Sequence, residues 1–211
     1  MGVGEVQHRA APRGRILGWF AVFCLAAVVL LLPALAWSQT NITYGELKLG
    51  VLGHDVHFLG GKEHGVDINP EVIFPSPVSN DWIATLPGYI RWAFQPRPTL
   101  GAEFNVGHYT NQYYFGATWT WQLVSNIVLP SDGLTFGIFF GPGFNDGLIR
   151  TAIPDRKSLG SNILFREALE LGYQFNPVYQ ISVFVDHTSN AGFARENQSI
   201  NDFGARLGIR F

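Results

Sequence analysis

A histidine and a serine stand two positions apart in the stretch DHTSNAG, residues 186–192. A serine hydroxyl becomes an effective nucleophile when a neighbouring imidazole takes its proton and a third group fixes the tautomer of that imidazole. Side chains two positions apart on a β-strand share a face, so His187 and Ser189 can come within reach of one another. Asn190 and the backbone around Ala191-Gly192 could donate hydrogen bonds to an oxyanion. These residue types and their spacing indicate a serine-esterase site.

The strand expected to carry this pair spans positions 178–189, and one of its faces is apolar until it reaches His187. If that face contacts lipid, a histidine and a serine on it would lack polar partners, which is costly. Catalysis on a lipid ester would explain their position. The alternative is a pair at the rim of a membrane protein that hydrogen-bonds to lipid headgroups or loops. The apolar residues on the same face are Tyr179, Ile181, Val183 and Val185.

Two residues could orient the imidazole. In a hairpin that turns over residues 176–178, Glu167 would lie directly opposite His187, with the two Cβ atoms about 4.5–5.5 Å apart. Glu167 is also the only charged residue on the apolar face of its strand. On the last strand, alternation places Asn201 on the outer face and Asp202 on the inner one. Both Glu167 and Asn201 therefore stay open as the third group.

The composition favours a β-structured membrane protein over a nucleic-acid-binding or helical one. The 211 residues suffice for one domain, and only 14% are charged, against about 25% in typical soluble domains. The formal net charge of −2 provides no basic stripe for a nucleic-acid partner. The 24 glycines, 17 phenylalanines and 6 tryptophans suit tight turns, strands and aromatic girdles.

The N-terminus has the pattern of a secretory signal peptide. Arginines precede an apolar run over residues 16–36, and that run ends in Ala34-Leu35-Ala36, an A-x-A cleavage site. We therefore expect a cleaved signal peptide at residues 1–36 and a mature domain at residues 37–211. The rival is an uncleaved transmembrane anchor, since about 20 apolar residues can span a bilayer. The single cysteine, Cys24, lies in this segment, so the mature chain would have no disulfide and no cysteine metal site.

After the N-terminal segment, stretches of about ten residues alternate between apolar and small or polar side chains. An antiparallel sandwich would also alternate, but strands of 9–11 residues match a tilted bilayer span. Arg166, Glu170, Arg206 and Arg210 share the small-residue face, which suits a narrow lumen filled by paired charges. We predict an all-β protein, an eight-stranded antiparallel transmembrane β-barrel, with no pore. The expected strands span residues 45–57, 65–75, 97–107, 112–122, 134–143, 162–176, 178–189 and 201–211.

The connections between these strands are predicted to alternate between long outside loops and short periplasmic turns. Residues 86–95 could form a ninth strand, but bacterial single-chain barrels have even strand numbers, so we assign them to a long connection. Trp119 and Trp121 share the apolar, lipid-facing side of their strand and are expected to be girdle or loop aromatics. The long connections expected are residues 57–65, 76–96, 144–161 and 190–200.

A cluster of histidines in HDVHFLGGKEH, residues 54–64, could suggest a metal site. It lacks a tight pattern such as H-E-x-x-H, and alternation puts His54 and His57 on opposite faces. We expect residues that line a loop and no metal ligand.

With these residues in view, the chain resembles the outer-membrane lipid A 3-O-deacylase family, the PagL-like proteins often labelled acyloxyacyl hydrolases. The resemblance covers most of the mature chain. Its carriers are GVLGHDV, GVDINPEVIF, RPTLGAEFN, RKSLGSNILFREALELGYQF and above all DHTSNAG, followed by Asn197 and a closing strand. It implies a barrel in the bacterial outer membrane that removes the ester-linked 3-hydroxyacyl chain at position 3 of lipid A, without a cofactor.

By this resemblance, His187 matches the family's base and Ser189 its nucleophile, while Asn190 and Gly192 match positions linked to the oxyanion hole. The chain departs from the family at Asn201, where characterised members have a glutamate. Asn201 could suffice, because an asparagine can hold a histidine. Otherwise Glu167 supplies the charge, or activity is low or lost.

The predicted partners are lipid A or lipopolysaccharide as substrate, together with the surrounding outer-membrane lipids. A homodimer is one possible assembly. Three basic residues that flank a long connection could meet lipid A phosphates, although solvated loop positions explain them as well. Two other functions stay open: a non-catalytic barrel that binds lipid or stabilises the membrane, and an esterase acting on another membrane lipid. The three basic residues are Arg150, Arg156 and Lys157.

Overall fold

The computed structural model describes residues 43–59 and 61–211. The expected signal peptide, its cleavage site and Cys24 lie outside the described residues, so they stay predictions. None of the described helices is long and apolar enough to span a membrane.

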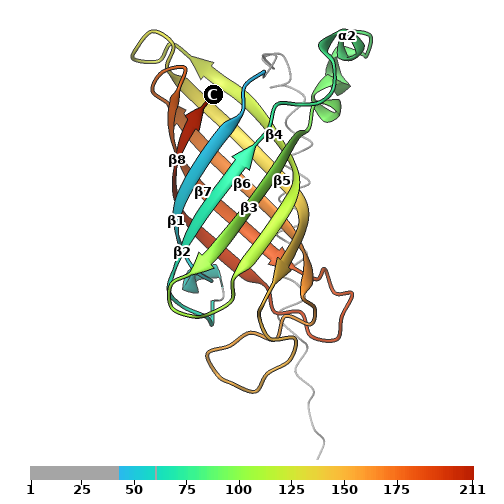
Figure 1. Cartoon of the computed structure of the whole chain (residues 1–211), viewed down its shortest axis with the longest axis vertical. Coiled ribbons are helices and arrows are strands. Elements are labelled where there is room, and N and C mark those ends of the chain that lie inside the picture. Colours follow the sequence, from blue (N-terminus) through green and yellow to red (C-terminus); the bar gives the residue numbers. More distant parts are fainter. Residues whose placement is uncertain (1–42, 60) are drawn as a thin grey trace, which may run out of the picture. The chain divides into compact units, whose positions relative to one another are not determined.

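Eight antiparallel strands form a closed barrel in which each strand pairs with the next and β8 pairs with β1 (Figure 1). The predicted fold class and all eight predicted strands are confirmed. Residues 86–95 are not a ninth strand, because most of them form the 3-10 helix η4 (Gly88–Phe94). The strands are β1 (Glu46–Gly53), β2 (Val66–Ile73), β3 (Arg97–Asn105), β4 (Gln112–Ser125), β5 (Gly133–Asn145), β6 (Ile163–Gln174), β7 (Tyr179–Ser189) and β8 (Ile200–Arg210).

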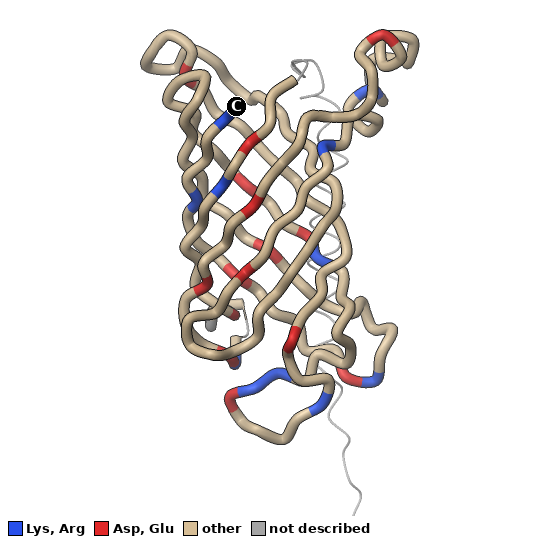
Figure 2. The backbone as a smooth tube through the Cα atoms, viewed as in Figure 1, with Lys and Arg blue, Asp and Glu red and all other residues tan. Residues whose placement is uncertain are grey.

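The alternation of side chains decides which face of each strand is the outside of the barrel. On β1, Leu47, Leu49 and Val51 are more than half exposed, whereas Glu46 and Lys48, at the alternate positions, are buried. An exposed apolar wall around a buried polar interior is the arrangement of a membrane barrel and the inverse of a soluble one. Figure 2 shows that acidic and basic positions follow the strands of the barrel as well as its loops.

The lumen is filled by ion pairs. The Arg166 guanidinium lies at the centre of one set, where it donates to Glu103 at 2.7 Å and to Asp186 at 2.9 Å. A second set joins Arg206 to Glu71. Buried charges require partners of this kind. Because these side chains occupy the interior, the barrel wall is braced from within, as the sequence predicted.

The two ends of the barrel differ in their connections. At one end, hereafter the site end, the connections are residues 54–65, 106–111, 146–162 and 190–199. At the other end lie the C-terminus and the connections 74–96, 126–132 and 175–178 (Figure 1).

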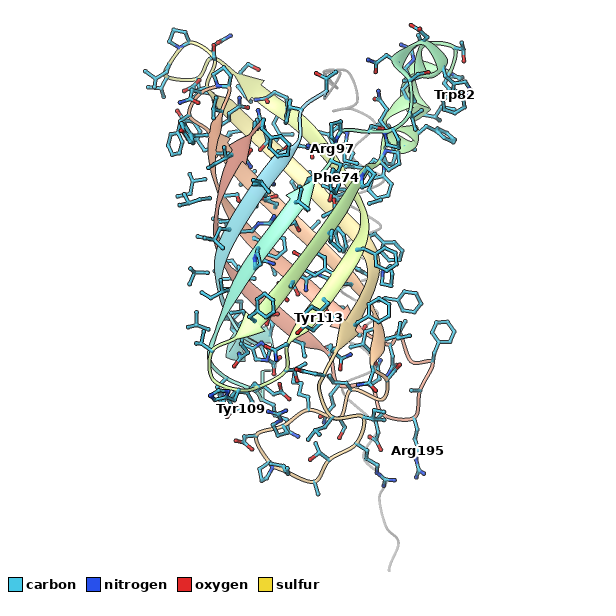
Figure 3. All side chains as sticks on the ribbon, in the orientation of Figure 1. Phe74, Trp82, Arg97, Tyr109, Tyr113 and Arg195 are labelled. Atoms are coloured by element: carbon cyan, nitrogen blue, oxygen red, sulfur yellow. The ribbon has the colours of Figure 1, made fainter. Side chains whose placement is uncertain are left out.

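The prediction that residues 76–96 form an outside loop is wrong. Strand directions alternate in an antiparallel barrel, so the β2–β3 connection must share its end with the short turns 126–132 and 175–178. It contains the short helix α2 (Asn80–Ala84), whose N-cap is Ser79, followed by η4. Figure 3 shows Trp82 of this connection, and at the site end the loop residues Tyr109 and Arg195.

Helix η4 packs on the outer wall of β4. The rings of Trp92 and Trp121 lie 5.8 Å apart, and Trp119 Nε1 donates to the carbonyl oxygen of Ala93 at 3.3 Å. Trp121 is consequently 1% exposed. The prediction that Trp121 faces lipid is wrong, because a neighbouring segment covers that part of the wall.

Candidate active site

The candidate site lies on the outer face of three adjacent strands at the site end. In the register of β6 and β7, Glu167 pairs with His187 and Phe165 with Ser189. In the register of β7 and β8, His187 pairs with Asn201. The predicted β6–β7 hairpin register is therefore confirmed, and one row across the three strands contains Glu167, His187 and Asn201.

Two hydrogen bonds join a serine, a histidine and an asparagine. The distance from His187 Nε2 to Ser189 Oγ is 3.0 Å, and that from His187 Nδ1 to Asn201 Oδ1 is 2.7 Å. An amide oxygen only accepts, so the Nδ1 nitrogen must carry the hydrogen and Nε2 presents a lone pair to the serine hydroxyl. This is the tautomer that a general base needs, and Ser189 and His187 are both half-buried.

The orientation of the Asn201 amide follows from its other contacts, as it must where hydrogens are not seen. Its Nδ2 faces the carbonyl oxygen of Leu59 at 3.4 Å and the Ser199 hydroxyl at 3.5 Å. A flipped amide would set two carbonyl oxygens against each other. The backbone N–H of Val56 also donates to the carbonyl oxygen of Asn201 at 2.8 Å. The β1–β2 connection thus holds Asn201 so that its oxygen faces His187.

Sequence reasoning missed the contribution of Leu59, because a backbone carbonyl leaves no mark in the pattern of side chains. Glu167 lies opposite His187, as predicted, and is half-buried. Both ring nitrogens of His187 are already engaged, however, and within the part of the chain that the structure describes Glu167 forms no hydrogen bond or ion pair. Its carboxylate offers a nearby negative charge and no hydrogen bond to the imidazole.

The turn after Ser189 is organised by the side chain of Asn190, which is 5% exposed. Asn190 Nδ2 donates to the carbonyl oxygens of Leu159 at 2.8 Å and Glu196 at 2.6 Å. Its Oδ1 accepts from the N–H of Gly192 at 2.9 Å. Asn190 therefore ties the turn to the β5–β6 connection and fixes its curvature.

The backbone of this turn adopts left-handed conformations, with φ of 53° at Ala191 and 83° at Gly192. A Cβ at position 192 would meet nothing within 4 Å, so glycine serves the backbone conformation and not the space. The N–H groups of Asn190 and Gly192, which were expected to face an oxyanion, already donate to Asn197 Oδ1 and to Asn190 Oδ1. Among the described residues, the N–H of Ala191 has no hydrogen-bond partner.

Behind the wall, a buried network fixes the β1–β2 connection. His54 Nδ1 lies 2.8 Å from Asp67 and Nε2 lies 3.3 Å from Glu63. Burial alone would lower the pKa of His54, but the hydrogen bonds to Asp67 and Glu63 outweigh it and raise the pKa to about 11. Burial would raise the pKa of Glu63, yet hydrogen bonds led by His54 lower it to about 2. His54 is thus a charged, buried residue that holds the β1–β2 connection in place.

The same network shows where one predicted lipid-facing cation lies. Lys157 is buried, and its Nζ donates to Asp55 at 2.6 Å, so it cannot meet a lipid phosphate. Arg156 lies over the ring of Tyr109 at 5.3 Å, and Arg150 is exposed beside Glu196. The backbone N–H of Asp55 donates to Asp202 Oδ1 at 2.7 Å, which joins this network to the lumenal side of β8.

The histidine at position 54 also contributes to a group with the spacing of metal ligands. Oxygen and nitrogen atoms of His54, Asp67 and Asp202 lie within 4.8 Å of one another, as do carboxylate oxygens of Glu103, Asp186 and Asp202. His54 is hydrogen-bonded to Asp67, and Asp202 accepts from the backbone N–H of Asp55. These hydrogen bonds between protein groups explain why the three side chains lie close together.

The chain was compared with known proteins. The sequence model of the family described as lipid A 3-O-deacylase (PagL) matches residues 88–210, more than half of the chain, including His187, Ser189 and Asn201. No curated protein sequence matches. The crystal structure of the outer membrane enzyme PagL is similar with a TM-score of 0.58 at 16% identity, covering 78% of this chain and 98% of that chain. Neisserial surface protein A has a TM-score of 0.44 at 10% identity, covering 80% and 96%.

Proposed function

The chain belongs to the lipid A 3-O-deacylase (PagL) family, and from this premise we propose that it is an outer-membrane esterase that hydrolyses the ester-linked 3-hydroxyacyl chain at position 3 of lipid A. The observation that carries the proposal is the hydrogen-bonded series Ser189, His187 and Asn201. It lies on the lipid-facing wall, where the ester of a membrane lipid would be met.

The reaction follows from the tautomer of His187. Ser189 Oγ attacks the ester carbonyl carbon while His187 Nε2 takes the hydroxyl proton. The tetrahedral intermediate collapses, the sugar oxygen leaves with the proton from Nε2, and the acyl chain stays on Ser189. A water then attacks this acyl-serine ester with His187 again as base. The products are a 3-hydroxy fatty acid and lipid A with a free hydroxyl at position 3, and the serine hydroxyl is restored.

The oxyanion of the tetrahedral intermediate needs hydrogen-bond donors at the turn that follows the nucleophile. We assign this role to the turn Asn190–Gly192, with the N–H of Ala191 as the group that is free to donate. Asn190 and Gly192 act by shaping the turn. Their own N–H groups become donors to the oxyanion only if the bonds to Asn197 and to Asn190 Oδ1 open.

In this proposal Asn201 orients the imidazole, and Glu167 acts through its charge without a hydrogen bond to the ring. Asn201 holds the tautomer without offsetting the positive charge that His187 gains during the reaction. Glu167, one strand away in the same row, supplies negative charge without touching the ring. Of the three alternatives that the sequence left open, the hydrogen bond at 2.7 Å favours Asn201 as the orienting group.

Mass spectrometry of lipid A tests the proposal, using a host that lacks this activity and expresses either the wild type or Ser189→Ala. We expect the wild type to remove one 3-hydroxyacyl chain and the variant to leave lipid A intact, with both folded in the outer membrane. Unchanged lipid A with the folded wild type would overturn the proposal in favour of a non-catalytic barrel. Loss of an acyl chain from a phospholipid alone would indicate a different esterase. The homodimer stays a prediction.

A further inference from the structure

Two phenylalanines at the site end are unusually exposed. Phe193, in the β7–β8 connection, is 85% exposed, and Phe58, in η3 (His57–Leu59), is 74% exposed. On the described strands, the most exposed large apolar side chain is Leu207 at 63%. A phenyl ring in water is unfavourable, and a general position at the membrane interface would favour tryptophan or tyrosine. Protein atoms leave most of each ring uncovered, so contact with an apolar ligand would be favourable at both.

The two rings lie on opposite sides of the catalytic pair. Phe193 contacts Phe165 with ring centroids 6.0 Å apart, and Phe165 pairs with Ser189 on the β6 side. Phe58 meets the edge of Phe203 at 5.9 Å. Phe203 is the next outward residue after Asn201 on the β8 side, where it pairs with Val185. One aromatic pair thus borders the site on each flank.

Each exposed ring is also linked to the backbone that assembles the site. The N–H of Phe193 donates to the carbonyl oxygen of Asn190 at 3.0 Å, within the turn that we assign to the oxyanion. Phe58 precedes Leu59, whose carbonyl oxygen orients the amide of Asn201. A ligand held between the two rings would therefore steady both the turn and the group that orients His187.

We propose that Phe58 and Phe193 form an aromatic clamp that holds the acyl chain of the ester substrate across Ser189. The proposal rests on the proposed function, because the acyl chain enters here only if Ser189 attacks its carbonyl carbon. From that carbon the chain leaves along the outward face of β7, over Val185 and the half-exposed Val183. The flanking rings bury the part of the chain nearest to the ester. The clamp sets how strongly a long acyl chain is favoured over a short one.

The test compares p-nitrophenyl myristate with p-nitrophenyl butyrate, and both with lipid A, in detergent micelles. Complete burial of one phenyl ring corresponds to about one to two powers of ten in affinity, and a clamp buries each ring in part. For Phe58→Ala and Phe193→Ala we expect KM for the myristate ester and for lipid A to rise about 5-fold each. We expect about 25-fold in the double variant. The KM and kcat for the butyrate ester should change much less than those for the myristate ester.

Phe144→Ala is the matched control, because Phe144 is an outward phenylalanine at the same end of the barrel, on β5, and is 41% exposed. Its kinetics should equal those of the wild type. Phe193→Leu should retain most of the preference for the long chain, since an apolar side chain remains. Migration of unheated protein in a denaturing gel checks that every variant is a folded barrel.

The outcomes separate the two proposals. The clamp is wrong if the double variant keeps the wild-type KM for the myristate ester and for lipid A, or if it loses activity equally on long and short esters. If the wild type leaves lipid A intact while the clamp variants lose their preference for the myristate ester, the lipid A proposal fails and the clamp stands. If the wild type cleaves lipid A alone, the KM for lipid A decides about the clamp.

Discussion

Two neighbouring rows of the same two strands show how the barrel divides its tasks. In one row His187 pairs with Asn201 on the outer wall, and in the next Asp186 pairs with Asp202 in the lumen. The lumenal pair is fully buried and bound by Arg166 and by the N–H of Asp55. The outer pair is joined by a single hydrogen bond, and His187 is also hydrogen-bonded to Ser189.

This comparison indicates that the buried ion pairs of the lumen position a smaller group of polar residues on the outer wall. The buried charges of the lumen are stabilised by ion pairs, and breaking such a pair is costly. These ion pairs therefore hold the backbones of the strands that carry His187 and Asn201. A slip of one residue in the register of β7 would move His187 into the lumen and Asp186 out to the lipid. The lumen should therefore govern stability, and the outer row should govern catalysis.

The largest loss of activity is expected when a residue of the outer row is replaced and the neighbouring lumenal row is left unchanged. His187→Ala should lower kcat/KM for release of the 3-hydroxy fatty acid by about 10⁴-fold or more, because the nucleophile loses its base. Thr188→Val is the matched control, since Thr188 is the next residue on β7, faces the lumen and is 1% exposed. It should change kcat/KM by less than about 2-fold. Equal losses in the two variants would contradict the division.

Arg166→Gln disrupts the ion pairs in the lumen. Removal of this guanidinium leaves Glu103 and Asp186 without their partner, and loss of one member of a buried ion pair costs about 3–5 kcal/mol. We expect the free energy of unfolding in urea, measured in micelles, to fall by about that amount. The activity of the folded fraction should stay near that of the wild type.

Arg150→Gln is the control for this change, because the side chain of Arg150 is 71% exposed and its distance to Glu196 is 3.7 Å. Such surface pairs contribute roughly 0–1 kcal/mol, so the unfolding curve should hardly move. If Arg166→Gln were as stable as Arg150→Gln, the lumen would not brace the barrel as described.

Within the outer row, Asn201 should matter more than Glu167. Asn201→Ala removes the hydrogen bond that fixes the tautomer of His187, and we expect kcat to fall by about 10²- to 10³-fold. Glu167→Gln removes a charge that makes no hydrogen bond to the ring, and an effect of about 2- to 5-fold is expected. Rates with lipid A in micelles decide the order. A greater loss in Glu167→Gln would transfer the supporting role to Glu167.

The last prediction concerns the pH at which the β1–β2 connection opens. The pKa of His54 rises from 6.5 to about 11 on folding, so its contribution to stability is full below pH 6.5 and declines as the pH rises towards about 11. The decline is at most about 1.4 kcal/mol per pH unit. Glu63, whose pKa falls from 4.5 to about 2, contributes fully above pH 4.5 and loses its contribution as the pH falls towards 2.

Limited proteolysis of residues 54–65 across this pH range measures the opening. The wild type should become more susceptible as the pH rises above 6.5. His54→Gln, which replaces the imidazole with an amide that does not titrate, should show a flatter dependence. Parallel pH profiles for the two proteins would exclude His54 as the source.

The sequence predicted those features that depend on alternation. Period-two patterns located the strands, and the register of the β6–β7 hairpin followed from its short turn, which placed Glu167 opposite His187. Features that depend on contacts between distant segments were missed. The carbonyl oxygen of Leu59 carries no side-chain signal, and the burial of Trp121 depends on η4, which lies elsewhere in the sequence.

The oxyanion turn shows the same limit at the scale of single hydrogen bonds. Residue types identified Asn190 and Gly192 as donors, but only the folded turn reveals that their N–H groups already have acceptors. The backbone around Ala191-Gly192 was also predicted to donate, but an alanine gives no sign of a left-handed backbone. That the N–H of Ala191 is the one without an acceptor therefore could not be inferred.

Covalent labelling of Ser189 tests directly whether His187 activates it as a nucleophile. The purified, folded barrel is treated with a serine-directed fluorophosphonate, and the modified peptide is identified by mass spectrometry. We predict a single adduct at Ser189, formed at a much lower rate in His187→Ala and absent in Ser189→Ala. An adduct at Ser189 that forms equally fast without His187, or modification only at other serines, would contradict it.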